Sequence, residues 1–388
     1  MTPVEEQTEQ PAVSVDEHLD RLLGFEPTTF PVLSVYLNTQ ADQHGRTPDL
    51  EPYLQREFKT LARTWPTGST ERASFDQDVE KITAYVKEKL DPASNGVALF
   101  ACSAADLFES VQMMAPVDEH KIYVYHQPHL FHLTRLDDEY PRYASVVIDA
   151  HTARIHVFGL GQMLETEVVK GKKVHRVKVG GWSQARYQRR LDNAYQAHAK
   201  EAVERLQRLV KEDNVKHIVI AGDPNIAPVL QEELPKELAE MVVNTIKLDI
   251  RASEQEVFAA TLDKIRELDA KTDAEKVARM FEEYRGRGLA VVGPEATLEA
   301  LTNGQVDELL ISVALEAQRP AQEPVDAIIA PEIPDSTGGT DSDEPREASL
   351  PDLLVTKAGQ TSATVSFIED ASLLESVGGV GAFLRWRA

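Results

Sequence analysis

Cysteine is nearly absent from this sequence, and its scarcity excludes two kinds of structure. Cys102 is the one cysteine among 388 residues, so neither an intrachain disulfide nor a cysteine-based zinc site can form. Cys102 lies inside an apolar run, which predicts a core residue. No apolar stretch is long enough to cross a bilayer, and residues 1–13 lack the basic and apolar regions of a signal peptide. We therefore expect a cytoplasmic protein that does not bind membranes.

Basic residues are also few. The chain has 41 Lys and Arg against 64 Asp and Glu, a formal net charge of −23. A general nucleic-acid binder needs Lys and Arg for its phosphate contacts, so this balance argues against that class. Local binding stays open, because the field at the contact surface decides it. The acidity on its own is also what keeps many proteins soluble.

One stretch, residues 168–210, runs against this balance. After Val168 no acidic residue occurs before Asp192. Its candidate RNA-binding residues, with the tryptophan as a stacking platform, are Lys170, Lys172, Lys173, Arg176, Lys178, Trp182, Arg186, Arg189 and Arg190. Such a stretch would direct an otherwise acidic protein toward RNA in one orientation.

A glycine pair and a glutamine stand in the middle of this stretch. Gly180 and Gly181 give the backbone freedom to bend, and Gln184 follows two residues later. Beyond Gln184 a helical period begins. The residues expected on one face of this helix are Leu191, Tyr195, His198, Ala202, Leu206 and Leu209. The pattern predicts a basic loop on a long helix, with Gln184 near the loop's tip.

Strand and helix patterns alternate along the chain, which predicts an α/β fold in three domains. We expect a disordered tail at 1–15, an N-terminal α/β domain at 16–141, a middle domain at 142–251 and a C-terminal domain at 252–388, with an acidic insert at 319–351. Helices are expected at 15–23, 50–65, 73–90, 253–285 and 294–302. Strands are expected at 31–37, 96–102, 111–114, 122–125, 144–149, 153–160, 217–223, 241–248, 288–293 and 306–312.

Two carboxylates at strand ends leave two interpretations open. Asp149 and Asp223 follow the apolar runs 144–148 and 217–222, and paired carboxylates on a sheet can bind a metal for phosphoryl chemistry. A nuclease would need more acids than these two. The alternative, which we favour, is that Asp223 caps the next helix and Asp149 starts a turn. We expect no metal and no cofactor.

The glycine–glutamine loop before a long helix resembles the middle domain of the archaeo-eukaryotic release factor and Pelota superfamily. Trp182 and Ser183 separate the glycines from Gln184, as in the bacterial release-factor-like branch, to which the Balon hibernation factors are related. Two further phrases resemble the C-terminal domain of the superfamily: residues 290–312, AVVGPEATLEALTNGQVDELLIS, and the closing glycines and Leu384-Arg385-Trp386. The resemblance implies a ribonuclease-H-like middle domain and an L7Ae-like C-terminal domain.

The resemblance also implies a function at the ribosome. It suggests a factor, acting as a monomer, that binds rRNA in the A site and hydrolyses or rescues peptidyl-tRNA. In that role Gln184 positions water, Gly180 and Gly181 allow close approach, and a translational GTPase docks on the third domain. A stop-codon-reading motif is absent between the helices at 50–65 and 73–90, so codon reading is not inferred. The alternative is a hibernation factor that places the same loop in the peptidyl-transferase centre without hydrolysis.

Overall fold

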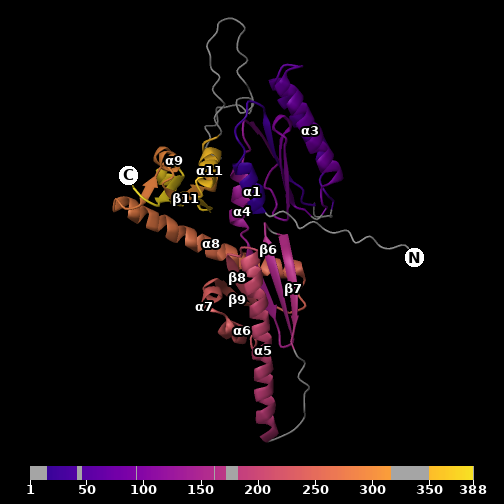
Figure 1. Ribbon diagram of the computed structural model, residues 1–388, viewed down its shortest axis with the longest axis vertical. Coiled ribbons are helices and arrows are strands. Elements are labelled where there is room, and N and C mark those ends of the chain that lie inside the picture. The colour runs from indigo at the N-terminus through magenta and orange to yellow at the C-terminus, as the bar shows by residue number, and fades with distance from the viewer. Residues whose placement is uncertain are drawn as a thin grey trace, which may run out of the picture. The chain divides into compact units, whose positions relative to one another are not determined.

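The computed structural model describes residues 15–41, 46–92, 94–160, 162–171, 182–315 and 349–387. These residues form two compact units. One unit joins residues up to 135 with residues from 277 onward, and the other is residues 136–276. Each of three sheets lies inside one of the ranges predicted as domains (Figure 1). The α/β class is confirmed, while the domain boundaries stay a prediction.

The first sheet is antiparallel throughout, with strand order β3-β2-β1-β4. Its strands are β1 (Val32–Asn38), β2 (Gly96–Cys102), β3 (Leu107–Met113) and β4 (Lys121–Tyr125). The helices of this part of the chain are α1 (Val15–Leu23), α2 (Glu51–Leu61), α3 (Thr70–Glu88) and α4 (Phe131–Glu139). Side chains of α2 and α3, such as Phe58 and Phe75, pack against β1 and β2 in one core. Cys102 is fully buried, as predicted.

The second sheet has the order β7-β6-β5-β8-β9. Its strands are β5 (Tyr143–Ile148), β6 (Thr152–Gly159), β7 (Gln162–Lys170), β8 (His217–Gly222) and β9 (Val242–Lys247). The first three strands along the chain pair antiparallel, and β8 and β9 run parallel to β5. An antiparallel meander extended by two parallel strands is the ribonuclease-H-like arrangement that the resemblance implied.

Helices cover both faces of this sheet. α5 (Trp182–Glu212) and α6 (Ala227–Glu233) pack on one face, and their core includes Leu206, Leu209 and Leu230. The first part of α8 (Glu254–Arg285) covers the other face through Val257 and Ile265. The short helix α7 (Lys236–Glu240) precedes β9. Both faces of β5 and β8 are buried, which is why their sequences are nearly continuous apolar runs.

The third sheet has the order β10-β13-β11-β12, in which β11 and β12 are parallel and the other pairs antiparallel. Its elements are β10 (Ala290–Val292), α9 (Pro294–Thr302), β11 (Val306–Ser312), α11 (Leu350–Gln360), β12 (Thr364–Ile368) and β13 (Val380–Leu384). α9 and α11 share one core with the sheet, and the end of α8 packs on a second core through Val277 and Met280. The division between the two units therefore falls inside α8, between residues 276 and 277.

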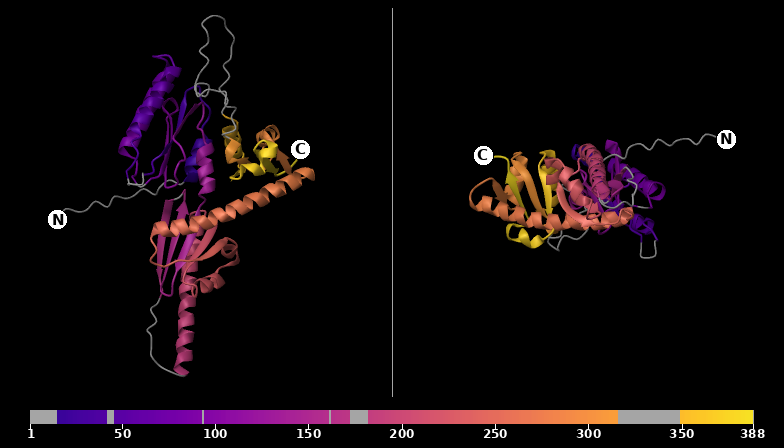
Figure 2. Two further views of the ribbon diagram at one scale, coloured as in Figure 1. Left: turned by 180° about the vertical axis from the view of Figure 1, so that it is seen from behind. Right: turned by 90° about the horizontal axis from the view of Figure 1, so that it is seen from below.

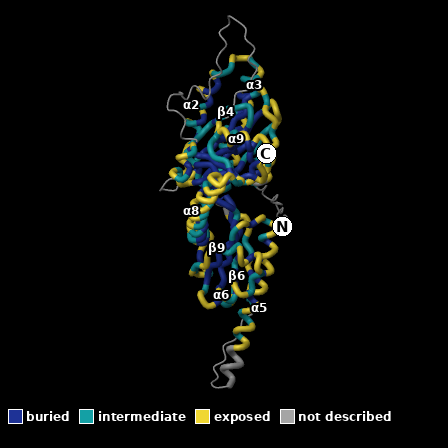
Figure 3. Tube along the Cα trace, turned by 90° about the vertical axis from the view of Figure 1, so that its left-hand side faces the viewer, coloured by how far each residue is buried: buried dark blue, intermediate teal, exposed yellow. Residues whose placement is uncertain are grey.

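Buried residues gather along the strands and on the inner sides of the helices (Figure 3). The expected capping box at the start of α8 is present, because the Ser253 N–H donates to Glu256 Oε2 at 2.8 Å and the Glu256 N–H donates to Ser253 Oγ at 3.3 Å. Within the described ranges, no helix is both long and apolar enough to cross a bilayer.

Six of the α-helices and strands were not expected from sequence: β7, α4, α7, α11, β12 and β13. The predicted insert 319–351 also ran two residues too far, because Leu350 and Pro351 belong to α11. Residues 319–348 of that insert and the predicted tail up to residue 14 lie outside the described residues.

Candidate functional site

The candidate site is carried by two neighbouring elements, β7 and α5. β7 ends at Lys170, and α5 begins at Trp182. The residues that connect them, 172–181, lie outside the described part of the chain. This range contains the predicted site residues Lys172, Lys173, Arg176, Lys178, Gly180 and Gly181.

α5 is anchored on the sheet by only part of its length. From Arg189 onward the first buried side chain is His198, and burial continues through Ala202, Leu206 and Leu209, which confirms the expected apolar face from His198 onward. Residues 189–197 are exposed or half-buried. The helix continues past the ends of the strands in both side views (Figures 1 and 2). We call residues 182–197 the arm.

Gln184 lies in the arm, within the first turn of α5. The helix begins three residues earlier than the sequence pattern indicated, so the backbone of Gln184 is helical rather than part of the loop. Trp182 and Arg186 also lie on the helix. By helix geometry, the N–H groups of the first turn have no carbonyl partner within the helix. The backbone N–H of Gln184 is thus one of the donors that this helix end directs outward.

The charges of α5 differ between the arm and the anchored half. Lys170 at the end of β7 and Arg189 and Arg190 in the arm are exposed, and within the described ranges none of the three has an ion-pair partner. In the anchored half, Lys200 pairs with Glu233 at 3.7 Å and Arg208 pairs with Glu167 of β7. Arg189 and Arg190 are therefore available for phosphates, while Lys200 and Arg208 are paired within the fold. Arg205 and Lys211 of the anchored half are also exposed.

The base of the arm is formed by Gly171 and His198. Gly171 follows β7, and its N–H donates to the carbonyl of His151 at 2.8 Å. An added Cβ at Gly171 would lie 2.9 Å from Cγ of His198. The glycine backbone thus lies directly against the imidazole, at the first buried position from Arg189 onward.

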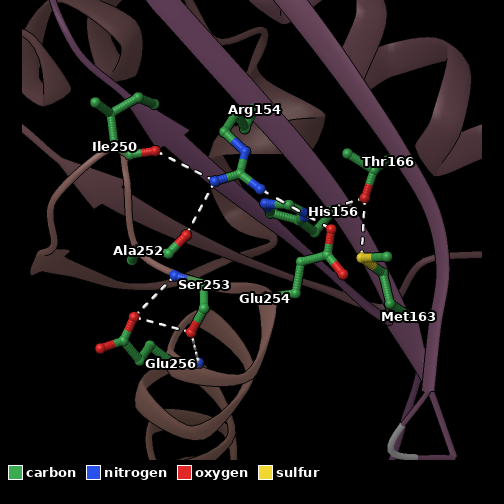
Figure 4. Close-up of polar contacts among 9 residues, drawn as sticks. All are labelled: Arg154, His156, Met163, Thr166, Ile250, Ala252, Ser253, Glu254 and Glu256. Carbon is green, nitrogen blue, oxygen red and sulfur yellow. Dashed lines mark hydrogen bonds and ion pairs between the residues drawn. The ribbon is translucent and has the colours of Figure 1, made fainter.

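The opposite face of the sheet holds the start of α8 (Figure 4). Arg154 of β6 donates through Nη1 to the carbonyls of Ile250 at 3.3 Å and Ala252 at 2.9 Å, and its Nη2 lies 4.0 Å from Glu254. Next to it on β6, His156 is fully buried and contacts the Thr166 hydroxyl at 2.9 Å through Nδ1. Burial and the Arg154 charge lower the pKa of His156 to about 4. His156 is therefore neutral at neutral pH and has a structural position away from the arm.

The two carboxylates at strand ends make local turns. Asp149 Oδ1 accepts from the N–H groups of His151 and Thr152, both at 2.7 Å, as expected for a turn. Asp223 Oδ1 accepts from the N–H of Asn225 at 2.8 Å. α6 starts only at Ala227, and no side chain caps it, so the prediction that Asp223 caps this helix is wrong. Within the described residues, no three His, Cys, Asp or Glu side chains gather as a metal site would require.

Comparison with known proteins relates this site to one family. Residues 128–266, which include the whole second sheet and the arm, match the model of bacterial archaeo-eukaryotic release factor family 10. Peptide chain release factor subunit 1 of Methanocaldococcus jannaschii is 24% identical over 302 residues, which cover 70% of this chain and 68% of the relative. An uncharacterized protein of Mycobacterium tuberculosis is 24% identical over 388 residues, with 95% and 97% covered.

Solved structures of the superfamily align over most of the chain at low similarity. The archaeal translation termination factor aRF1 has a TM-score of 0.26 and 15% identity, and covers 96% of this chain and 97% of its own. Pelota of Archaeoglobus fulgidus has a TM-score of 0.33 and 13% identity, with 75% and 79% covered.

The matched part of the chain, residues 128–266, falls in the bacterial branch of the archaeo-eukaryotic release factor superfamily, whose family 10 model covers the sheet and the helix that carry Gln184.

Proposed function

We propose that this protein is a translation factor that binds the ribosomal A site and places the arm in the peptidyl-transferase centre. The observation that carries the proposal is the arm itself. In a chain of net charge −23, it is a helix that extends beyond its sheet and carries exposed Arg189 and Arg190, neither of which has an ion-pair partner among the described residues. Membership of the release factor superfamily supports the same role. Phosphate contacts by these cations would orient the acidic body away from rRNA.

Within this role, Gln184 is proposed to promote hydrolysis of peptidyl-tRNA. Ester hydrolysis needs a positioned water and hydrogen-bond donors to the developing oxyanion. A backbone N–H in the first turn of a helix is such a donor, and the helix dipole adds partial positive charge there. Gly180 and Gly181 would let the preceding backbone approach the tRNA end closely.

Ribosome binding is tested by neutralising the arm. The double variant Arg189→Ala/Arg190→Ala should co-sediment with 70S ribosomes less strongly and show a weaker salt dependence. The matched control is Arg205→Ala/Lys211→Ala, which removes the same charge from exposed positions in the anchored half of the same helix. Equal binding by both double variants would contradict the proposal.

Hydrolysis is tested by release of a labelled peptide from stalled ribosomes. Gln184→Ala keeps the backbone N–H and removes the side-chain amide that would position the water, so it should slow release about a hundredfold, with ribosome binding unchanged. Release that survives this change would exclude a catalytic role for the Gln184 side chain.

A second function, occupancy of the ribosome without hydrolysis, is favoured by one observation. Gln184 lies within α5, two residues beyond the helix start, so its backbone has helical rather than loop conformation. An occupancy factor would bind vacant ribosomes tightly and release no peptide from stalled ones. The same two assays therefore separate the functions.

We also propose a translational GTPase as partner, docking on the third sheet, because residues 290–312 resemble the superfamily's C-terminal domain. Affinity capture of the full chain from a bacterial extract, with and without a non-hydrolysable GTP analogue, tests this. Absence of any GTPase in both captures would contradict it.

A further inference from the structure

The imidazole of His198 leaves no room for a side chain at Gly171. An added Cβ at Gly171 would meet Cγ of the imidazole at 2.9 Å and Nδ1 at 3.0 Å. The exposed fraction of His198 is 2%, and neither ring nitrogen has a hydrogen-bond partner within the described residues. The imidazole ring therefore packs directly against the backbone at the end of β7.

General stability does not explain a histidine at this position. Burying polar nitrogens without partners is unfavourable, and an apolar side chain would avoid that cost. What the imidazole supplies is a flat ring that fits against a residue without a side chain. The property of His198 that matters at this position is thus the shape of its ring, which fits against Gly171.

The other contacts between β7 and α5 lie on one side of this point. Val169 packs in the same core as Ala199 and Ala202, and Glu167 pairs with Arg208. Between residues 189 and 197 no side chain is fully buried, and His198 is the first buried residue from Arg189 onward. Tyr195 is half-buried and still packs against this core, so the arm leaves the sheet within one turn of His198.

A small rotation at His198 is amplified along the arm. Gln184 precedes His198 by 14 residues, which is about 21 Å at the rise of an α-helix. A tilt of about 5° at the base would move Gln184 by about 2 Å, and a misplacement of about 1 Å can slow an oriented reaction a hundredfold. The direction of the arm must therefore be set accurately at its base.

We propose that Gly171 and His198 form a fulcrum that sets the direction of the arm, and that His198 is a positioning residue for Gln184. The functional consequence rests on the proposed function, whereas the mechanical claim does not. His198 itself contacts neither ribosome nor tRNA in this proposal, since its side chain is buried.

The mechanical claim is tested without ribosomes, by a spin-label distance. Labels at Arg190→Cys in the arm and Lys247→Cys at the end of β9, both exposed positions, would be introduced in the full chain with Cys102→Ala. The parent should give one narrow distance distribution. Gly171→Ala and His198→Asn should broaden it or shift it by about 1 Å, the displacement that a tilt of about 5° gives at Arg190, eight residues from His198. Gln196→Ala, an exposed change on the same helix, should leave it unchanged, and unchanged distributions in all variants would overturn the proposal.

Two further variants separate a fulcrum from loss of folding. His198→Phe keeps a flat ring and should keep the distribution narrow. His198→Ala removes the atoms that the added methyl group would meet, so Gly171→Ala/His198→Ala should be less perturbed than the sum of its single changes. A phenylalanine variant as broad as His198→Asn, or strict additivity in the double variant, would overturn the ring-packing argument.

The peptide-release assay then connects the fulcrum to function. Gly171→Ala and His198→Asn should lower the maximal release rate at least tenfold and change the half-saturating ribosome concentration less than twofold, because the arm's cations are intact. If the parent releases no peptide, the proposed hydrolysis is rejected. The spin-label distances still test whether Gly171 and His198 set the direction of the arm. If the parent and these variants release peptide equally fast, the positioning role of His198 is rejected, and the proposed function is unaffected.

Discussion

Asp352 Oδ1 accepts a hydrogen bond from the backbone N–H of Leu130 at 2.7 Å, although the two residues are 222 positions apart. The same oxygen accepts from the N–H of Phe131 at 3.1 Å. A carboxylate from the first turn of α11 thus satisfies the free donors at the start of α4. Asp352 is fully buried, and the Phe131 ring packs edge-on against Phe367 with centroids 5.2 Å apart. Through these contacts α4 is part of the core of the third sheet.

Removing this cap should destabilise the first unit. Asp352→Ala leaves two buried N–H groups without an acceptor, so we expect the free energy of unfolding to fall by about 2–3 kcal/mol. Asp352→Asn keeps an oxygen acceptor and should lose less. Asp370→Ala is the control, because Asp370 caps a short helix at the surface by accepting from the Ser372 N–H at 3.0 Å; it should cost about 1 kcal/mol or less. Urea unfolding measures all three, and equal losses for Asp352→Ala and Asp370→Ala would contradict the role of the buried cap.

His156 should make stability depend on pH. Burial and Arg154 lower its pKa from 6.5 to about 4 in the folded chain. Below pH 6.5 the unfolded chain takes up a proton that the folded chain refuses, so stability falls as the pH drops from about 6.5 to about 4 and no further below that. By pH 5 the loss from this residue should be about 2 kcal/mol.

The measurement is urea unfolding of the parent and of His156→Gln at pH 7.5 and pH 5. Other titrating groups are common to both proteins, so the difference between them isolates His156. The parent should lose stability relative to the variant on acidification. A difference that does not change with pH would show that His156 is not held neutral by the fold.

Gly222 should tolerate no side chain. Its φ is +131°, and an added Cβ would lie 2.0 Å from the carbonyl oxygen of Ile148, its partner on β5. Gly222→Ala must therefore separate β8 from β5 or shift the backbone, and we expect a loss of at least about 4 kcal/mol. Gly304→Ala is the matched control, because Gly304 also has positive φ, at +66°, but its Cβ would meet open space; that change should cost about 1 kcal/mol. Thermal unfolding distinguishes the two.

Arg154 should stabilise the start of α8 against local unfolding. Arg154→Met leaves the carbonyls of Ile250 and Ala252 without this donor, so local opening should become easier by about 1–2 kcal/mol. Amide hydrogen exchange in residues 253–258 should then accelerate about tenfold. Arg251→Met, an exposed change in the same segment, should leave the exchange unaltered. Similar acceleration in both variants would show that Arg154 is not the anchor.

Elements with strong local patterns were predictable. The apolar runs that became β5 and β8, the capping box at Ser253 and the periodic face of α5 from His198 onward all lie where expected. β7 was missed because it is an edge strand whose residues, QMLETEVVK, mix charged and apolar side chains. α4 was missed for a different reason: no Ser, Thr, Asp or Asn immediately precedes Phe131, and its cap comes from Asp352.

The sequence by itself determined the α/β class, the superfamily and the basic stretch around Gln184, because periodicity, composition and short motifs are properties of neighbouring residues. Only the tertiary structure decided that Gly171 lies against His198 and that Asp352 caps α4. It also decided that Arg208 is neutralised by Glu167, whereas Arg189 and Arg190 have no ion-pair partner in the described part of the chain. These relationships join residues that are 27, 222 and 41 positions apart, and which side chains meet at such separations is set by the packing of strands and helices rather than by local pattern.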